Sequence, residues 1–108
     1  VVTAQDTICD GFPLYGTGDP LDYGLVGCYC AQYNTPKAAR TMWNMLTKAS
    51  ARVFNPEMKY GIEVGNDADL NLVEAPNVHD AIRTRASRPY IIRHGKVIAS
   101  FIRRAQLL

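Results

Sequence analysis

At the start of the chain, the pattern of apolar and polar positions predicts a short buried strand followed by a long loop. Residues 1–4 are mostly β-branched or apolar and give way to Gln5 and Asp6, as a buried strand does at its end. Between residues 6 and 19, glycines and a proline alternate with apolar side chains, which indicates an ordered loop. Loops of this length in compact domains are usually functional.

Two helix starts follow, each marked by a capping residue and a proline. Asp19-Pro20 and Thr35-Pro36 both place a side-chain acceptor before a residue whose φ already suits a helix. The first helix is expected to end near Tyr33 and the second near Val53. The second is predicted to be amphipathic, because its apolar residues recur at spacings of three and four. These residues, which we interpret as core, are Ala39, Met42, Trp43, Leu46, Ala49 and Val53.

Short strands and tight turns are predicted for the second half of the chain. Residues 69–74 alternate polar and apolar side chains and predict a strand with one buried face. Asn77 is a cap for a short helix over residues 78–85. Residues 89–93 and 96–101 flank His94-Gly95 and predict a β-hairpin.

These elements predict an α/β fold in two parts. Residues 1–54 would form a terminal strand, a loop and two helices, and residues 55–108 an accessory β-structure. The chain has 108 residues, of which 47% are hydrophobic and 20% charged, as expected of a globular unit. A complete (β/α)8 barrel needs on the order of 200 residues or more, so any relation to that fold must be partial.

Charge and cysteine content narrow the classes of function. The formal net charge is +2 and the basic residues are scattered, which argues against nucleic-acid binding. The longest uncharged stretch, residues 23–36, is short of the ~18–20 apolar residues that span a bilayer. Three cysteines are an odd number, which favours a reducing compartment, and we expect the cytoplasm. Cys28 and Cys30 lack a second ligand pair, so we interpret them as small buried residues.

One carboxylate stands out as a candidate for chemistry. Asp6 follows an apolar strand and precedes a glycine-rich loop, the place where βα architectures keep their reacting groups. A metal ion would keep such a carboxylate ionised, whereas the simpler alternative is an aspartate that caps the loop. His79 and His94 belong to no metal-binding pair and are interpreted as surface residues.

The order of these features resembles the final barrel strand and following loop of the cytosine deaminase branch of the amidohydrolase superfamily. The loop from Ile8 to Leu21 contains an acidic residue, an aromatic, a proline and then Gly-Thr-Gly-Asp. Later matches to the same family are Ser50-Ala51-Arg52, Tyr60-Gly61-Ile62, the run from Gly65 to Leu70, and the run from Arg93 to Ala99. The resemblance covers about residues 1–101 and roughly the last quarter of a family member.

The resemblance implies the last βα unit of a (β/α)8 barrel plus a small C-terminal β-structure, an incomplete fold. It also implies a hydrolase that cleaves an exocyclic amine or amide C–N bond of a small heterocyclic or amide substrate. Asp6 matches the aspartate that ligates the metal and takes part in proton transfer. Thr7 and Phe12 stand at substrate-contacting positions. Thr7 replaces an acid and Gln5 replaces a histidine, so the substrate is expected to differ.

The family's cofactor is a divalent metal, iron or zinc, and its other ligands would precede Val1. The chain alone is therefore expected to retain no metal and no activity. We expect it to need a partner, either the N-terminal barrel portion or a second copy, because the first helix and strand are apolar on several sides. The alternative is a non-catalytic module, derived from such a segment, that binds another protein.

Overall fold

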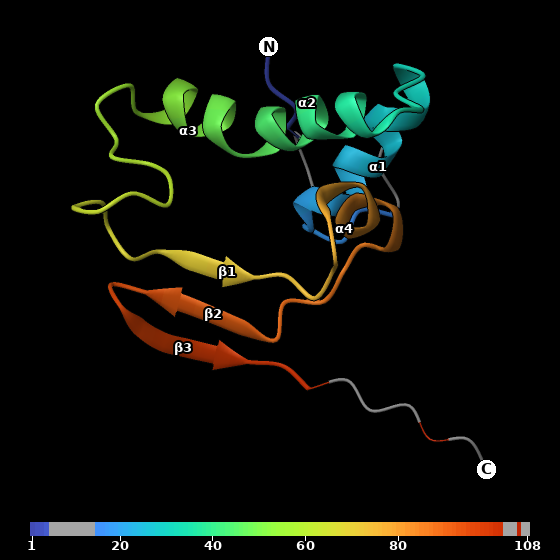
Figure 1. Ribbon diagram of the computed structural model, residues 1–108. Helices are drawn as coiled ribbons and strands as arrows, with labels where there is room; N and C mark the ends of the chain where they lie inside the picture. The colour runs from blue at the N-terminus through green and yellow to red at the C-terminus, as the bar shows by residue number, and fades with distance from the viewer. Residues whose placement is uncertain (5–14, 103–105, 107–108) are drawn as a thin grey trace.

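A helical group and a small sheet make up the described part of the chain, residues 1–4, 15–102 and 106, in a computed structural model (Figure 1). The helices are α1 (Pro20–Cys30), α2 (Pro36–Leu46), α3 (Lys48–Phe54) and α4 (Val78–Thr84). The strands are β1 (Leu70–Leu72), β2 (Tyr90–Arg93) and β3 (Lys96–Ser100). The mixed helix and strand content predicted from the sequence is confirmed.

Helix α1 begins where the sequence predicted and ends earlier. Asp19 is its N-cap, and the side chain accepts a hydrogen bond from the backbone N–H of Leu21 at 2.9 Å. The helix stops at Cys30 instead of Tyr33 because Gln32 adopts a positive φ of 54°. The N–H of Tyr33 then donates to the carbonyl of Cys28 and closes the turn at 2.8 Å.

The second predicted helix is two helices, so the expectation of one helix to Val53 is wrong. Thr47 interrupts it with φ −120° and ψ −93°. Its hydroxyl donates to the carbonyl of Trp43 at 2.7 Å, a bond that competes with the backbone and bends helices. Beyond the break Ala51 is buried and Val53 is 71% exposed, so the prediction of Val53 as a core residue is wrong.

The core lies where α1, α2 and α4 meet. Leu21, Met42 and Ile82, one from each helix, form the buried cluster, and Trp43 packs against it. Glycines in α1 allow this approach, because a Cβ on Gly24 would lie 2.5 Å from Cδ1 of Leu46. Met42 and Trp43 are thus packing residues, as predicted. Since α4 comes from the second half of the chain, the core joins both halves, while the division at residue 54 stays a prediction.

The three strands form one antiparallel sheet in the order β1-β2-β3. The predicted hairpin is confirmed: β2 and β3 pair through His94 and Gly95, whose φ angles of 48° and 72° fit a type I′ turn. The buried face expected for residues 69–74 is wrong, since Leu72 is 44% exposed. Within the described residues, no helix packs against a strand, so no described helix covers the sheet.

Residues 1–4 form no strand in the described part of the chain. Thr3 instead lies against α2, where its N–H donates to the carbonyl of Met45 at 3.5 Å and its hydroxyl contacts the sulfur of Met42 at 3.5 Å. A strand requires a neighbouring strand for its ladder, and the described residues offer none at this position. The barrel unit implied by the resemblance stays a prediction.

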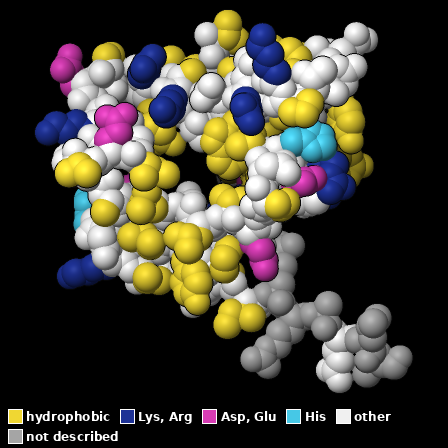
Figure 2. Space-filling model, in the orientation of Figure 1, with side chains coloured by type: hydrophobic (Ala, Val, Ile, Leu, Met, Phe, Trp, Pro, Cys, Tyr) yellow, Lys and Arg dark blue, Asp and Glu magenta, His cyan; other side chains and the backbone are white. Residues whose placement is uncertain are grey.

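The chain exposes more surface than a folded monomer of its size. Its accessible area is 8780 Å², whereas a 12.0 kDa monomer exposes about 6,000 Å². Its radius of gyration of 15.1 Å exceeds the ~13 Å expected for this length. Figure 2 shows hydrophobic side chains gathered over the sheet. Among the helices described, none has the length and apolar character needed to cross a membrane.

Candidate functional site

The three residues predicted to act on a substrate, Asp6, Thr7 and Phe12, lie outside the described residues. The structure therefore does not test their roles. It does describe the chain on both sides of them, up to residue 4 and again from Tyr15. The described residues nearest in sequence to the candidate site are therefore those on these two sides of it.

On the later flank, the N-terminus of α1 holds a compact set of polar contacts. The backbone N–H of Asp19 donates to the hydroxyl oxygen of Thr17 at 3.2 Å. The Thr17 hydroxyl in turn donates to Oδ2 of Asp22. The two carboxylates also suit the positive end of the helix dipole. The residues just before α1 are thus tied to its first turn.

Two arginines from the segment between α4 and β2 complete this set. Nη2 of Arg88 donates to Oδ2 of Asp19, and Nη1 of Arg85 pairs with Oδ1 of Asp22 at 3.5 Å. Arg85 is the C-cap of α4 and has a left-handed φ of 49°, which ends the helix and starts the segment that carries Arg88. We call the four residues Asp19, Asp22, Arg85 and Arg88 the flank clamp.

Sequence reasoning found only part of the flank clamp. It identified Asp19 as a helix cap, which is confirmed, and gave no role to Asp22, Arg85 or Arg88. The partners are 69 and 63 residues apart in the chain, so no local spacing signals them. The opposite charges were the only available signal, and many other pairs share it.

The flank clamp borders an open cavity of about 570 Å³ between the helical group and the end of the sheet. Its walls combine charged and apolar groups. They are Asp19, Arg85, Ala86, Ser87, Arg88, Ile91, Ser100, Phe101 and Ile102. Since Asp19, the carboxylate among these lining residues, is paired with Arg88, the described walls offer no free carboxylate as a base.

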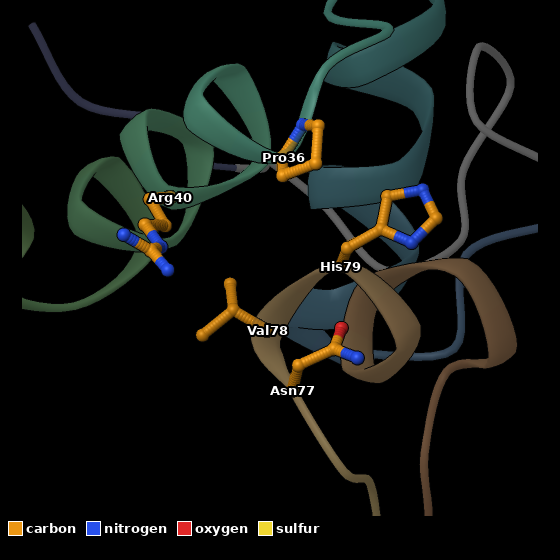
Figure 3. A pocket seen from close by; sticks show the side chains of 5 residues that line it. All are labelled: Pro36, Arg40, Asn77, Val78 and His79. Carbon is orange, nitrogen blue, oxygen red and sulfur yellow. The ribbon is translucent and has the colours of Figure 1, made fainter.

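A second cavity, of about 390 Å³, lies between the first turns of α2 and α4. Figure 3 shows its lining residues Pro36, Arg40, Asn77, Val78 and His79. The side chains of Arg40 and His79 lie on opposite sides of Val78 and do not converge. The arrangement does not resemble an acid–base pair.

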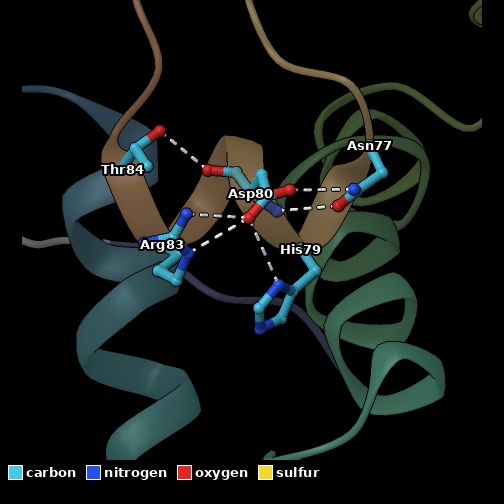
Figure 4. A network of polar contacts seen from close by, with 5 residues as sticks. All are labelled: Asn77, His79, Asp80, Arg83 and Thr84. Carbon is cyan, nitrogen blue, oxygen red and sulfur yellow. Dashed lines mark hydrogen bonds and ion pairs between the residues drawn. The ribbon is translucent and has the colours of Figure 1, made fainter.

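A polar network around Asp80 stabilises the start of α4 (Figure 4). The Asp80 carboxylate accepts from Nη2 of Arg83 at 3.0 Å and from the amide of Asn77 at 2.9 Å. These bonds to Arg83 and Asn77 lower the pKa of Asp80 below its usual value. His79 contacts the same carboxylate at 3.6 Å with its side chain 52% exposed. The prediction that His79 is a surface residue is confirmed.

The described residues do not form a metal site on their own. Across residues 1–4, 15–102 and 106, no three histidine, cysteine or acidic side chains are grouped as a metal site requires. The thiols of Cys28 and Cys30 are both free, and partial burial raises the pKa of Cys28. Cys28 packs against the core cluster, whereas Cys30 is exposed, so the prediction of a small buried residue is wrong for Cys30.

Comparison with known proteins supports the resemblance seen in the sequence. No family model matches the chain. N-isopropylammelide isopropyl amidohydrolase from Pseudomonas sp. (strain ADP) is 34% identical over 95 residues, which is 88% of this chain and 24% of that protein. The chain therefore spans about a quarter of the curated relative that it matches.

Two solved structures are similar to the chain in fold and sequence. The 5-methylcytosine deaminase from Klebsiella pneumoniae, liganded with phosphonocytosine, superposes with a TM-score of 0.87 at 28% identity, over 97% of this chain and 26% of that one. N-isopropylammelide isopropylaminohydrolase from Burkholderia multivorans gives a TM-score of 0.74 at 26% identity, over 80% of this chain and 22% of that one. The chain matches the C-terminal segment of a cytosine deaminase-like member of the amidohydrolase superfamily.

Proposed function

We propose that this chain is the C-terminal segment of a metal-dependent hydrolase that cleaves an exocyclic amine or amide C–N bond of a small heterocyclic or amide substrate. The observation that carries the proposal is the TM-score of 0.87 to a 5-methylcytosine deaminase over 97% of the chain. The relatives with 34% and 26% identity are, by name, an isopropyl amidohydrolase and an isopropylaminohydrolase of N-isopropylammelide. These names and that of the deaminase support the hydrolysis of a C–N bond.

Three residues of this chain take part in the proposed reaction. Asp6 would be one ligand of the metal, and its carboxylate, kept ionised by the metal, would accept a proton from the attacking water. Phe12 packs on the substrate ring and Thr7 hydrogen-bonds a substrate polar group. With a hydroxyl in place of an acid at residue 7, we propose a substrate other than cytosine itself.

The metal and the remaining catalytic groups come from outside this chain in the proposal. A divalent ion, iron or zinc, supplies the lowered pKa of the attacking water in such hydrolases. The described residues hold no cluster for it, so Asp6 would be this chain's contribution to a ligand set completed elsewhere. We therefore propose that the chain alone is inactive and keeps no metal.

The large exposed area of the chain supports a surface that binds a partner. The 8780 Å² of accessible surface exceeds the about 6,000 Å² that a monomer of this mass exposes, and exposed apolar side chains of β3 such as Val97 and Ile98 contribute to it. We propose that this exposed surface is covered by the N-terminal barrel portion or, alternatively, by a second copy of the chain. Scattered basic residues argue against a nucleic-acid partner, and the odd number of cysteines favours the cytoplasmic location that we propose.

The test compares this chain with the longer polypeptide that carries it. Both are assayed for amine release from cytosine, 5-methylcytosine and N-isopropylammelide, and their metal content is measured. We expect activity and bound metal only in the longer polypeptide. A metal-free longer polypeptide inactive on all three substrates, beside a folded 108-residue chain that binds another protein, would instead support the non-catalytic module.

Within the longer polypeptide, one pair of variants tests the assignment of Asp6. Asp6→Asn removes the proposed ligand and base, and we expect kcat to fall by a factor of roughly 10³ or more. Asp10→Asn is the matched control, because it neutralises another acid of the same loop. We expect it to change kcat less than about threefold. Equal losses in both variants would remove Asp6 from its proposed role.

A further inference from the structure

We propose that Arg88 is a positioning residue that holds, through Asp19, the end of the loop carrying the substrate-contacting residues. This inference rests on the proposed function. Arg88 lies on the segment between α4 and β2, far along the chain from the loop itself, and it contacts Asp19 within the flank clamp.

Asp19 performs two tasks with its two carboxylate oxygens. Oδ1 accepts from the N–H of Leu21 and caps α1, while Oδ2 accepts from Nη2 of Arg88. The cap requires only a neutral acceptor, which an asparagine supplies equally well. The negative charge is therefore needed for the pair with Arg88 and not for the capping hydrogen bond, although it also interacts favourably with the helix dipole. The two tasks can be separated by a single substitution.

Of the two ion pairs in the flank clamp, the pair of Arg88 with Asp19 is the stronger. Its side chain is 26% exposed and that of Asp19 is 23% exposed, so solvent screens this pair only in part. The side chain of Arg85 is 59% exposed and lies 3.5 Å from Asp22, a geometry typical of a weak surface pair. The bond from Arg88 is charge-assisted at both ends, the stronger class of hydrogen bond. Arg88 is thus the residue to test.

The flank clamp and Thr3 tie down the two sides of residues 5–14. On the earlier side, Thr3 bonds the carbonyl of Met45 in α2. On the later side, Thr17 and Asp19 are bonded to the first turn of α1 and to Arg88. Phe12 is nearer in sequence to the later anchor and Asp6 to the earlier one. Loss of Arg88 is therefore expected to disturb substrate contact more than metal binding.

The expected signature is a change in KM without a matching change in kcat. In the longer polypeptide, Arg88→Ala should raise KM about fivefold while kcat and metal content change less than about twofold. Asp19→Asn keeps the cap and should give the same rise. The double variant should be no worse than either single variant, because the two residues act as one pair. Arg88→Lys should restore part of the loss.

Arg83→Ala is the matched control, because it also removes an arginine–aspartate pair but lies within α4, in the Asp80 network. We expect its KM to be unchanged. If Arg88→Ala lowers kcat and metal content with KM unchanged, Arg88 supports folding only and the inference is wrong. Additive effects of Arg88→Ala and Asp19→Asn would also overturn it.

A second measurement separates failure of this inference from failure of the proposed function. Hydrogen exchange at the amides of Leu21 and Asp22 is followed in the longer polypeptide. Arg88→Ala should accelerate it about fivefold and Arg83→Ala should not. If the unaltered polypeptide is inactive, the proposed function fails, and with it the role in substrate contact, whatever the exchange rates are. Activity in the unaltered polypeptide together with unchanged exchange in Arg88→Ala would overturn the flank clamp alone.

Discussion

The helical group and the sheet differ in how each is stabilised. Every fully buried apolar residue of the described chain lies in a helix or, for Ala86, just after α4. The sheet has none, and residues on its strands such as Val97 are 59% exposed. A sheet of three strands needs a hydrophobic face or a packed helix for independent stability, and no described helix packs on this one. Within the described residues, burial thus stabilises the helical group, whereas the sheet relies on its ladder and turn.

The largest expected effect tests whether the stability of the chain resides in the helical group. Met42 is 2% exposed and contacts both α1 and α4 through the core cluster. Met42→Ala should lower the free energy of unfolding by about 2–5 kcal/mol, since it leaves a cavity. Met58→Ala is the matched control, because that methionine is 43% exposed. Chemical denaturation followed by circular dichroism measures both, and equal losses would contradict the comparison.

A smaller effect is expected when the sheet is weakened at its turn. Gly95 has a φ of 72°, which an L-residue adopts at a cost, and no side chain crowds it closely. Gly95→Ala should destabilise the hairpin by about 1 kcal/mol. Hydrogen exchange should accelerate in β2 and β3 and stay unchanged in α1 and α2. Acceleration throughout the chain would show that sheet and helices unfold as one unit.

The smallest effect concerns the pH dependence of the α4 network. Bonds from Arg83 and Asn77 lower the pKa of Asp80 in the folded state. A lowered folded pKa contributes stability above the unfolded value of 3.8, and this is lost as the pH falls through the folded pKa. Asp80→Asn should therefore reduce the acid sensitivity of α4 below that pH. An NMR titration of Asp80 with a midpoint at or above 3.8 would contradict this.

Local signals along the chain predicted the starts of the elements well. Asp19-Pro20, Thr35-Pro36 and Asn77 each cap a helix, and His94-Gly95 forms the hairpin turn. These signals are local because a cap or a turn involves residues within three or four positions of each other. The breaks at Thr47 and Gln32 were missed, since a helix end without proline or glycine depends on what packs beyond it.

The candidate site could be predicted only in part. The proposed roles of Asp6, Thr7 and Phe12 derive from the resemblance and stay predictions. The pairing of Asp19 with Arg88 could not be predicted, because the two residues are brought together by the packing of α4 against α1. Sequence spacing alone does not indicate which arginine of the chain pairs with Asp19.

The sequence by itself determined the helix caps, the hairpin turn and the resemblance to the deaminases. Caps and turns are decided by neighbours in the chain, and the family motifs consist of the residues themselves. Only the tertiary structure decided that the second predicted helix breaks at Thr47, that α4 completes the core, that no described helix covers the sheet, and that Arg88 meets Asp19. Contacts between distant residues depend on the packing of whole elements, which no short stretch of sequence specifies.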